Sequence, residues 1–155
     1  TGHVENRLTI KGSQFLEAAR VGHLATADAR GRPHVVPAVF VLDGGRIYTP
    51  IDGKPKGDPR KLRRILNIAE NPNAAFMVDR YEEDWTRLAF ILVRGTASIL
   101  SAGPSATDPA EREEYRRIEA LLRKKYPQYE SVSLGGPEGL MIRITPETCT
   151  TWGQL

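Results

Sequence analysis

Six basic side chains gather between residues 54 and 64, with one acid, Asp58, among them. They are Lys54, Lys56, Arg60, Lys61, Arg63 and Arg64. Ammonium and guanidinium groups bind phosphates and carboxylates through charge-assisted hydrogen bonds. Six minus one gives +5 for this stretch against +3 for the chain, which leaves −2 for the rest. One basic locus on a mildly acidic body favours a compact anionic ligand.

A helix predicted from Pro59 to Glu70 places these basic groups. Asp58 before a proline is typical of an N-cap and a first helical position, and Asn71-Pro72 ends the pattern. The apolar residues inside it follow the i, i+3, i+4, i+7 spacing of an inward face, and they are Leu62, Ile65, Leu66 and Ala69. The arginines lie roughly on the other side.

The stretch predicts a phosphate cradle. The strand before it ends at Tyr48-Thr49, where a hydroxyl can donate to an anion, and Lys54 and Lys56 lie in the intervening loop. The first N–H groups of the helix add unpaired donors and the positive end of its dipole. The pattern GxxxxGK[ST] is absent, so this is no Walker loop. An ordinary solvated surface helix is the alternative interpretation.

The remaining pattern predicts a mainly β fold. Six segments have the alternation or apolar density of strands, and turns at "DARG" and "DGG" join the first three. Further strands are "NAAFMVDRY", "RLAFILVRGTASIL" and "GLMIRIT", the last extended by "CTTWG". Pro33 and Pro37 suggest a sheet edge, a bulge or a place where the backbone leaves the ladder to face a ligand, and Gly95 suggests a bulge. Helices are expected at 13–20, with Ser13 as N-cap, at 59–70 and at 109–125. Six antiparallel strands of this spacing close most easily into a small barrel with the helices outside.

Bulk properties narrow the class. A chain of 155 residues suits a single domain over residues 1–155. No apolar run approaches the length of a membrane span, and the first residues lack the apolar core of a signal peptide. Cys149 is the only cysteine, which favours an intracellular, cytoplasmic setting and excludes an internal disulfide. His3 and His23 have no ligand spacing with other donors, so no metal site is expected.

Longer motifs carry a family resemblance. They are "GHLATADARGRPHVVPAVFVLDGGRIYTP", the basic helix followed by "NPNAAFMVD", "DRYEEDWTRLAFILVRGTASIL", and the final "TPETCTTW". With these motifs the chain resembles the pyridoxamine 5′-phosphate oxidase-like family of split β-barrel flavoproteins. Within that family it looks most like the branch that uses the deazaflavin coenzyme F420.

The resemblance implies a flavin or deazaflavin lying across the barrel at the interface of a homodimer. It implies phosphate contacts from Arg63, Arg64 and the Thr49 hydroxyl, and it places the strand His34–Pro37 along the ring system. Relatives also bring their terminal strand towards the flavin. The predicted cofactor-binding residues are therefore His34, Val35, Val36, Pro37, Tyr48, Thr49, Lys54, Lys56, Arg63, Arg64 and Trp152. His34 is a candidate proton donor, but no catalytic residue is assigned.

One departure bears on the cofactor. The loop after Thr49 is longer than in many relatives, so Lys54 and Lys56 have no general counterpart. F420 carries a phosphodiester and a glutamate tail, whereas FMN ends at its phosphate, so the extra lysines fit F420. The expectation is an F420-dependent oxidoreductase that transfers a hydride between its cofactor and a small conjugated organic substrate.

Three alternatives remain open. The first is an FMN-binding oxidase or reductase of the pyridoxamine 5′-phosphate oxidase type, and the second is a non-catalytic cofactor- or haem-binding module on the same fold. The third is nucleic-acid binding through the basic helix. The near-neutral remainder of the chain and the lack of interleaved aromatic residues argue against the third.

Overall fold

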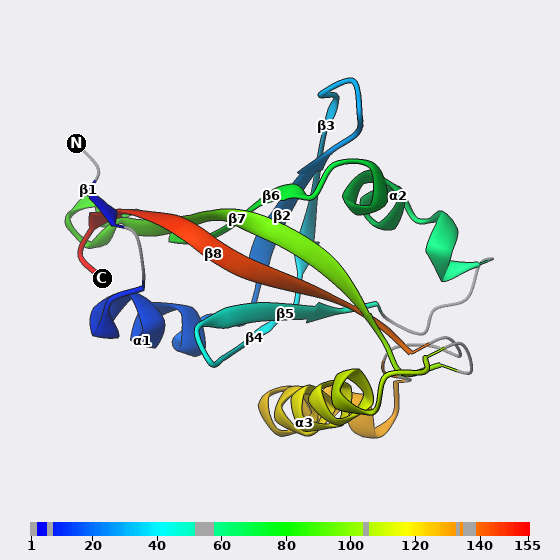
Figure 1. Cartoon of the computed structure of the whole chain (residues 1–155). Coiled ribbons are helices and arrows are strands. Elements are labelled where there is room, and N and C mark those ends of the chain that lie inside the picture. Colours follow the sequence, from blue (N-terminus) through cyan, green and yellow to red (C-terminus); the bar gives the residue numbers. More distant parts are fainter. Residues whose placement is uncertain (1–2, 6–7, 52–57, 104–105, 133, 135–138) are drawn as a thin grey trace.

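A computed structural model describes residues 3–5, 8–51, 58–103, 106–132, 134 and 139–155 of the chain. Eight strands form one antiparallel sheet in the order β3-β2-β6-β7-β8-β5-β4, with β1 paired to β8 (Figure 1). Their bounds are β1 His3–Glu5, β2 Gly22–Ala27, β3 Pro33–Ala38, β4 Val41–Asp43, β5 Arg46–Pro50, β6 Asn73–Arg80, β7 Ala89–Ser101 and β8 Leu140–Gly153. Among the described strands the ladder ends at β3 and β4, so the curved sheet stays open, as in a split barrel.

Three α-helices lie around this sheet (Figure 1). They are α1 Ile10–Ala18, α2 Arg63–Glu70 and α3 Pro109–Lys125. Short 3₁₀ turns occupy Pro59–Lys61, Trp85–Arg87 and Pro127–Glu130. In the described ranges, no helix has the length and apolar character needed to cross a membrane. The prediction of a mainly β fold with three helices is confirmed.

The helix boundaries correct two details of the prediction. α3 spans the predicted residues, with Asp108 accepting from the Ala110 N–H at 2.9 Å. α1 begins earlier than predicted because Thr9, and not Ser13, is its N-cap, and the Thr9 hydroxyl accepts from the Gly12 N–H. Asp58 caps only the 3₁₀ turn, and extended Leu62 separates that turn from α2.

The sheet has eight strands where the sequence predicted six. The second predicted strand splits into β3 and β4 around residues 39–40, and β1 adds a short strand. Gly44 and Gly45 both have positive φ, as the two-residue turn between β4 and β5 requires. The expected bulge is present at Arg94/Gly95. A Cβ on Gly95 would lie 2.0 Å from the Thr145 carbonyl oxygen, so only glycine lets the strands approach so closely.

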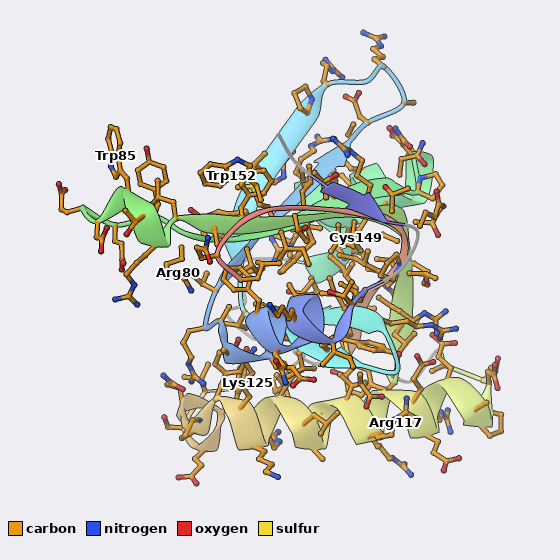
Figure 2. The ribbon with its side chains drawn as sticks, turned by 90° about the vertical axis from the view of Figure 1, so that its left-hand side faces the viewer. Arg80, Trp85, Arg117, Lys125, Cys149 and Trp152 are labelled. Carbon is orange, nitrogen blue, oxygen red and sulfur yellow. The ribbon has the colours of Figure 1, made fainter. Side chains whose placement is uncertain are left out.

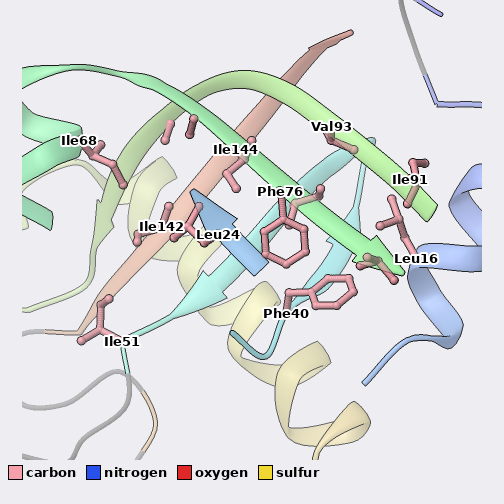
Figure 3. Packing of buried hydrophobic residues seen from close by; sticks show 14 of the residues in the cluster. Leu16, Leu24, Phe40, Ile51, Ile68, Phe76, Ile91, Val93, Ile142 and Ile144 are labelled. Atoms are coloured by element: carbon pink, nitrogen blue, oxygen red, sulfur yellow. The ribbon is translucent and has the colours of Figure 1, made fainter. Parts of the chain in front are cut away.

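Two apolar clusters hold the elements together. The larger lies inside the curved sheet, where Phe40 meets Phe76 edge-to-face at 4.8 Å (Figure 3). Leu16 of α1 and Ile68 of α2 belong to the same cluster. The smaller lies under α3, and its members are Val41, Tyr48, Leu100, Tyr115, Ile118, Leu122, Tyr126, Tyr129, Leu134 and Met141. α1 and α2 thus cover the inner side of the sheet, and α3 covers the end at β4 and β5.

Candidate functional site

Thr49 and Arg64 line one cavity of about 240 Å³. The first lies at the end of β5, the second in the first turn of α2, and Pro37 and Val39 come from the end of β3 and the residue after it. The other lining residues are Val21, Ala38 and Pro50. Among its described lining residues the cavity has one cation, one hydroxyl and no acid. This lining suits a ligand in which an anionic group is attached to an apolar one.

The pleat of β5 explains why Thr49 faces the cavity and Tyr48 does not. Successive strand residues point to opposite faces. Tyr48 points under α3, is 1% exposed, and donates its hydroxyl proton to Glu114 Oε2 at 2.6 Å. Burial, followed by this contact with Glu114, raises the pKa of the Tyr48 hydroxyl. Tyr48 was predicted to bind the cofactor beside Thr49. Its side chain lies instead in the smaller apolar cluster under α3 and does not line the cavity.

α2 is fixed on its inner face, and its first turn borders the cavity. Ile65 and Ile68 are buried in the core, and Asn67 Nδ2 donates to Thr26 Oγ1 of β2 at 3.1 Å. Leu62, at the N-cap, supplies no side-chain hydrogen bond to the first N–H groups of the helix. Arg64 lines the cavity from this end, whereas Arg63 is exposed and does not line it. A helix start beside a guanidinium favours anion binding.

β3 is an edge strand, as Pro33 and Pro37 suggested. Its alternation turns Val35, which is 61% exposed, and Pro37 outwards. His34 and Val36 point to the inner side, where Val36 packs against the core. His34 Nδ1 is buried and has no hydrogen-bond partner in the part of the chain that the structure describes. Only Pro37 of the predicted four-residue strand lines the cavity with Thr49 and Arg64.

The structure places Trp152 far from this cavity. Thr49 pairs with Ile142 on β8, and Trp152 lies ten positions further along the same strand, a separation of roughly 30 Å. There Trp152 stacks on Phe90, with ring centroids 6.1 Å apart. Lys54 and Lys56 fall outside the described residues.

Comparison with known proteins decides the family. The family model described as pyridoxamine 5′-phosphate oxidase matches residues 8–153. The chain belongs to this family. The resemblance found in the sequence is therefore confirmed at the level of the family.

The chain is also similar in sequence to a curated protein, the 5a,11a-dehydrotetracycline/5a,11a-dehydrooxytetracycline reductase of Streptomyces rimosus subsp. rimosus. It is 32% identical over 146 residues, which cover 94% of this chain and 82% of the relative. The pyridoxamine 5′-phosphate oxidase family and this reductase together support an oxidoreductase of the flavin type.

Solved structures share the fold. A FAD-binding protein of Mesorhizobium loti is 23% identical with a TM-score of 0.66, and the match covers 96% of each chain. The haem storage protein HutZ of Vibrio cholerae is 19% identical with a TM-score of 0.58, and the match covers 91% of each chain. These two proteins of one fold thus differ in the group that their names give, and the fold alone does not select one.

The sequence reasoning missed several residues of the site. Val21, Val39 and Pro50 form apolar walls of the cavity, and nothing in their residue type marks them for binding. Nothing in the sequence pointed to Glu114 either, which binds polar side chains on the other face of β5. It accepts from Tyr48 and from Arg143 Nη1, each at 2.6 Å. Burial would raise the pKa of Glu114, but these two hydrogen bonds and the positive charges of Arg143 and Arg46 outweigh it and hold that pKa below its ordinary value.

Proposed function

We propose that this protein is an F420-dependent reductase that delivers a hydride to a small conjugated organic acceptor. The observation that carries the proposal is the meeting of Thr49 and Arg64 in one cavity at the sheet edge, in a chain 32% identical to a reductase. The name of that relative gives dehydrotetracyclines as its substrates. The acceptor proposed here belongs to the wider class of conjugated organic molecules.

Each protein group has a defined task in this proposal. The Thr49 hydroxyl donates to a phosphate oxygen, and Arg64 balances the phosphate charge. The first N–H groups of α2, which the Leu62 side chain does not cap, add donors from the same side. Pro37 and Val39 keep the adjoining wall apolar, which suits a flat ring system. When bound, the deazaflavin supplies the hydride chemistry, and the protein supplies binding, orientation and electrostatics.

The cavity is too small for the whole cofactor. Ligand sites usually enclose about 300–1,000 Å³, and this one has about 240 Å³, enough for the phosphate end. A second copy of the chain is the proposed source of the missing walls. The outer face of β2, β6 and β7 presents a row of registered neighbours, His23, Met77 and Leu92, next to Ala25 and Ala75. These side chains are only half-buried, and β3 adds the exposed Val35.

Leu92→Glu tests this dimer. A carboxylate in the middle of an apolar contact loses its hydration, so we expect the variant to run as a monomer and to lose cofactor affinity. Light scattering after gel filtration gives the mass. Val132→Glu, a substitution at an exposed apolar residue outside the sheet, is the matched control and should not change the mass. A wild-type monomer, or an unchanged dimer in Leu92→Glu, would refute the proposed interface.

FMN is the second candidate cofactor, since the phosphate contacts described above serve it equally well. Titration of the purified protein with F420 and FMN side by side, followed by fluorescence, separates the two. We expect F420 to bind at least about tenfold more tightly, or 1.4 kcal/mol. The double variant Lys54→Ala/Lys56→Ala should lose about tenfold in F420 affinity and keep its FMN affinity, because only F420 has an anionic tail beyond its first phosphate.

Other outcomes have definite meanings. Selective binding of FMN would assign the protein to the flavin-using members of the family. Tight binding of F420 without turnover of any conjugated acceptor would favour a non-catalytic binding module. An intense Soret band after incubation with haem, with neither flavin bound, would assign it to haem handling.

A further inference from the structure

Lys125 ends α3 and extends towards α1 and the larger core (Figure 2). Its Nζ lies 4.0 Å from the centroid of the Phe40 ring and 5.4 Å from that of Tyr126. The same atom is shielded from solvent and has no hydrogen-bond partner among the described residues. Lysine amines are almost never buried without a partner. The position of Lys125 therefore needs an explanation beyond packing.

The surroundings disfavour the charged form of this amine. Burial, and after it the positive charge of Arg20, lower the pKa of Lys125 to about 8, while Glu17 opposes them. Arg20 is itself fixed over the Tyr126 ring at 4.6 Å. Lys124 lines the same cavity as Lys125, and the residues that β4 contributes to its lining, Val41 and Leu42, are uncharged. A lysine that is desolvated and next to another cation is the arrangement that makes an amine nucleophilic near neutral pH.

A cavity of about 420 Å³ adjoins this amine. The Lys125 side chain borders it together with Val41, Leu42 and Leu121, and Glu17 and Lys124 complete the lining. This cavity shares no lining residue with the one at Thr49 and Arg64. Its volume lies in the range of small-molecule sites, and its walls are largely apolar.

Protonation changes how strongly Phe40 holds the amine. The ammonium form is attracted to the face of Phe40 by the ring quadrupole. The neutral amine lacks that attraction. The Lys125 side chain already borders the cavity, so rotation about its last bonds can turn a neutral Nζ towards it. The form that reacts is thus also the form that the ring holds less strongly.

We propose that Lys125 is a reactive lysine that captures small apolar aldehydes as imines in this cavity. The nitrogen lone pair attacks the carbonyl carbon and forms a C–N bond. The carbonyl oxygen then leaves as water with both amine hydrogens, and the C=N bond remains. The reaction consumes no oxidant or reductant, and it is independent of the reductase function proposed above.

Reductive trapping tests the proposal. The full-length protein is incubated at pH 7 with butanal and sodium cyanoborohydride, which converts an imine to a stable secondary amine, and the labelled lysine is identified by peptide mass spectrometry. Lys124 is the matched control, since it is exposed, adjacent and borders the same cavity. We expect label at Lys125 at least about tenfold faster than at Lys124, because a lysine with the ordinary pKa of about 10.4 is almost wholly protonated at this pH.

Variants give independent readings. Lys125→Met keeps the length and apolar character of the stem, so it should stay folded, by its melting temperature, and lose the fast label. Arg20→Gln should move the midpoint pH of labelling at Lys125 upwards, because it removes the neighbouring cation. Labelling of Lys125 at or below the rate of Lys124, or a fast label that persists in Lys125→Met, overturns the proposal.

Discussion

Tyr48 and Thr49 are neighbours on β5, yet they belong to two regions that differ in almost every physical respect. On the Tyr48 face, α3 covers an apolar cluster. There Glu114 accepts hydrogen bonds from Tyr48 and from Arg143. On the Thr49 face, a hydroxyl and the Arg64 side chain border an open cavity beside a sheet edge. The difference teaches that the first face is completed within the chain, whereas the second leaves a cavity, which the proposed cofactor would fill.

The largest expected effect concerns the closed face. Glu114→Ala removes the acceptor of both Tyr48 and Arg143, and the side chains of Glu114 and Arg143 are only 15% and 26% exposed. We expect a loss of about 2–3 kcal/mol in the free energy of unfolding, because the Tyr48 hydroxyl loses its acceptor and the Arg143 guanidinium loses its counter-charge. Urea denaturation measures it. Cofactor affinity should stay within about threefold of wild type. A large loss of affinity with little loss of stability would show that the two faces are not separate.

The converse prediction concerns the open face. Arg64→Ala should lower cofactor affinity by about 10- to 100-fold, since charge-assisted hydrogen bonds contribute roughly 1.5–3 kcal/mol. Its free energy of unfolding should fall less than that of Glu114→Ala, because Arg64 belongs to neither apolar cluster. Arg116→Ala on the exposed side of α3 is the matched control for charge. Equal affinities in the two variants would contradict the assignment of Arg64.

The smallest expected effect is a pH dependence confined to the closed face. The pKa of Glu114 in the folded chain lies below its ordinary value of 4.5. A carboxyl with a depressed pKa contributes stability that is fully present above the unfolded value and is lost as the pH falls through the folded one. Thermal melts between pH 6 and 3 should therefore show a steeper acid loss in the wild type than in Glu114→Gln. Parallel curves would mean that Glu114 is not held as described.

Local chemistry explains which parts of the fold could be predicted. α3 was predicted to the residue because Asp108-Pro109 and a strong apolar stripe agree with each other. α1 was misplaced because Thr9 and Ser13 are both good N-caps, and only packing of the helix selects between them. The signal at Asp58-Pro59 was real, but it governs a single 3₁₀ turn, since Leu62 is extended.

The site was predictable only in part. The family resemblance suggested that Thr49 and Arg64 act together, and the structure brings them to one cavity. The partner of Tyr48 could not be foreseen, because Glu114 lies 66 residues away and the pairing depends on how α3 docks. Lys125 escaped notice for the same reason, since its sequence neighbours make it look like an ordinary helix-end lysine.

β8 has a consequence for how the chain assembles. It is 14 residues long and pairs with β1, β5 and β7. The last described strand of the chain is thus paired with the first. Until β8 has been synthesised, β5 and β7 have no strand between them, and their hydrogen-bonding edges stay open. A sheet with such high contact order forms slowly. A nascent chain that stalls before residue 140 would therefore expose strands ready to aggregate, and such intermediates are the targets of chaperones.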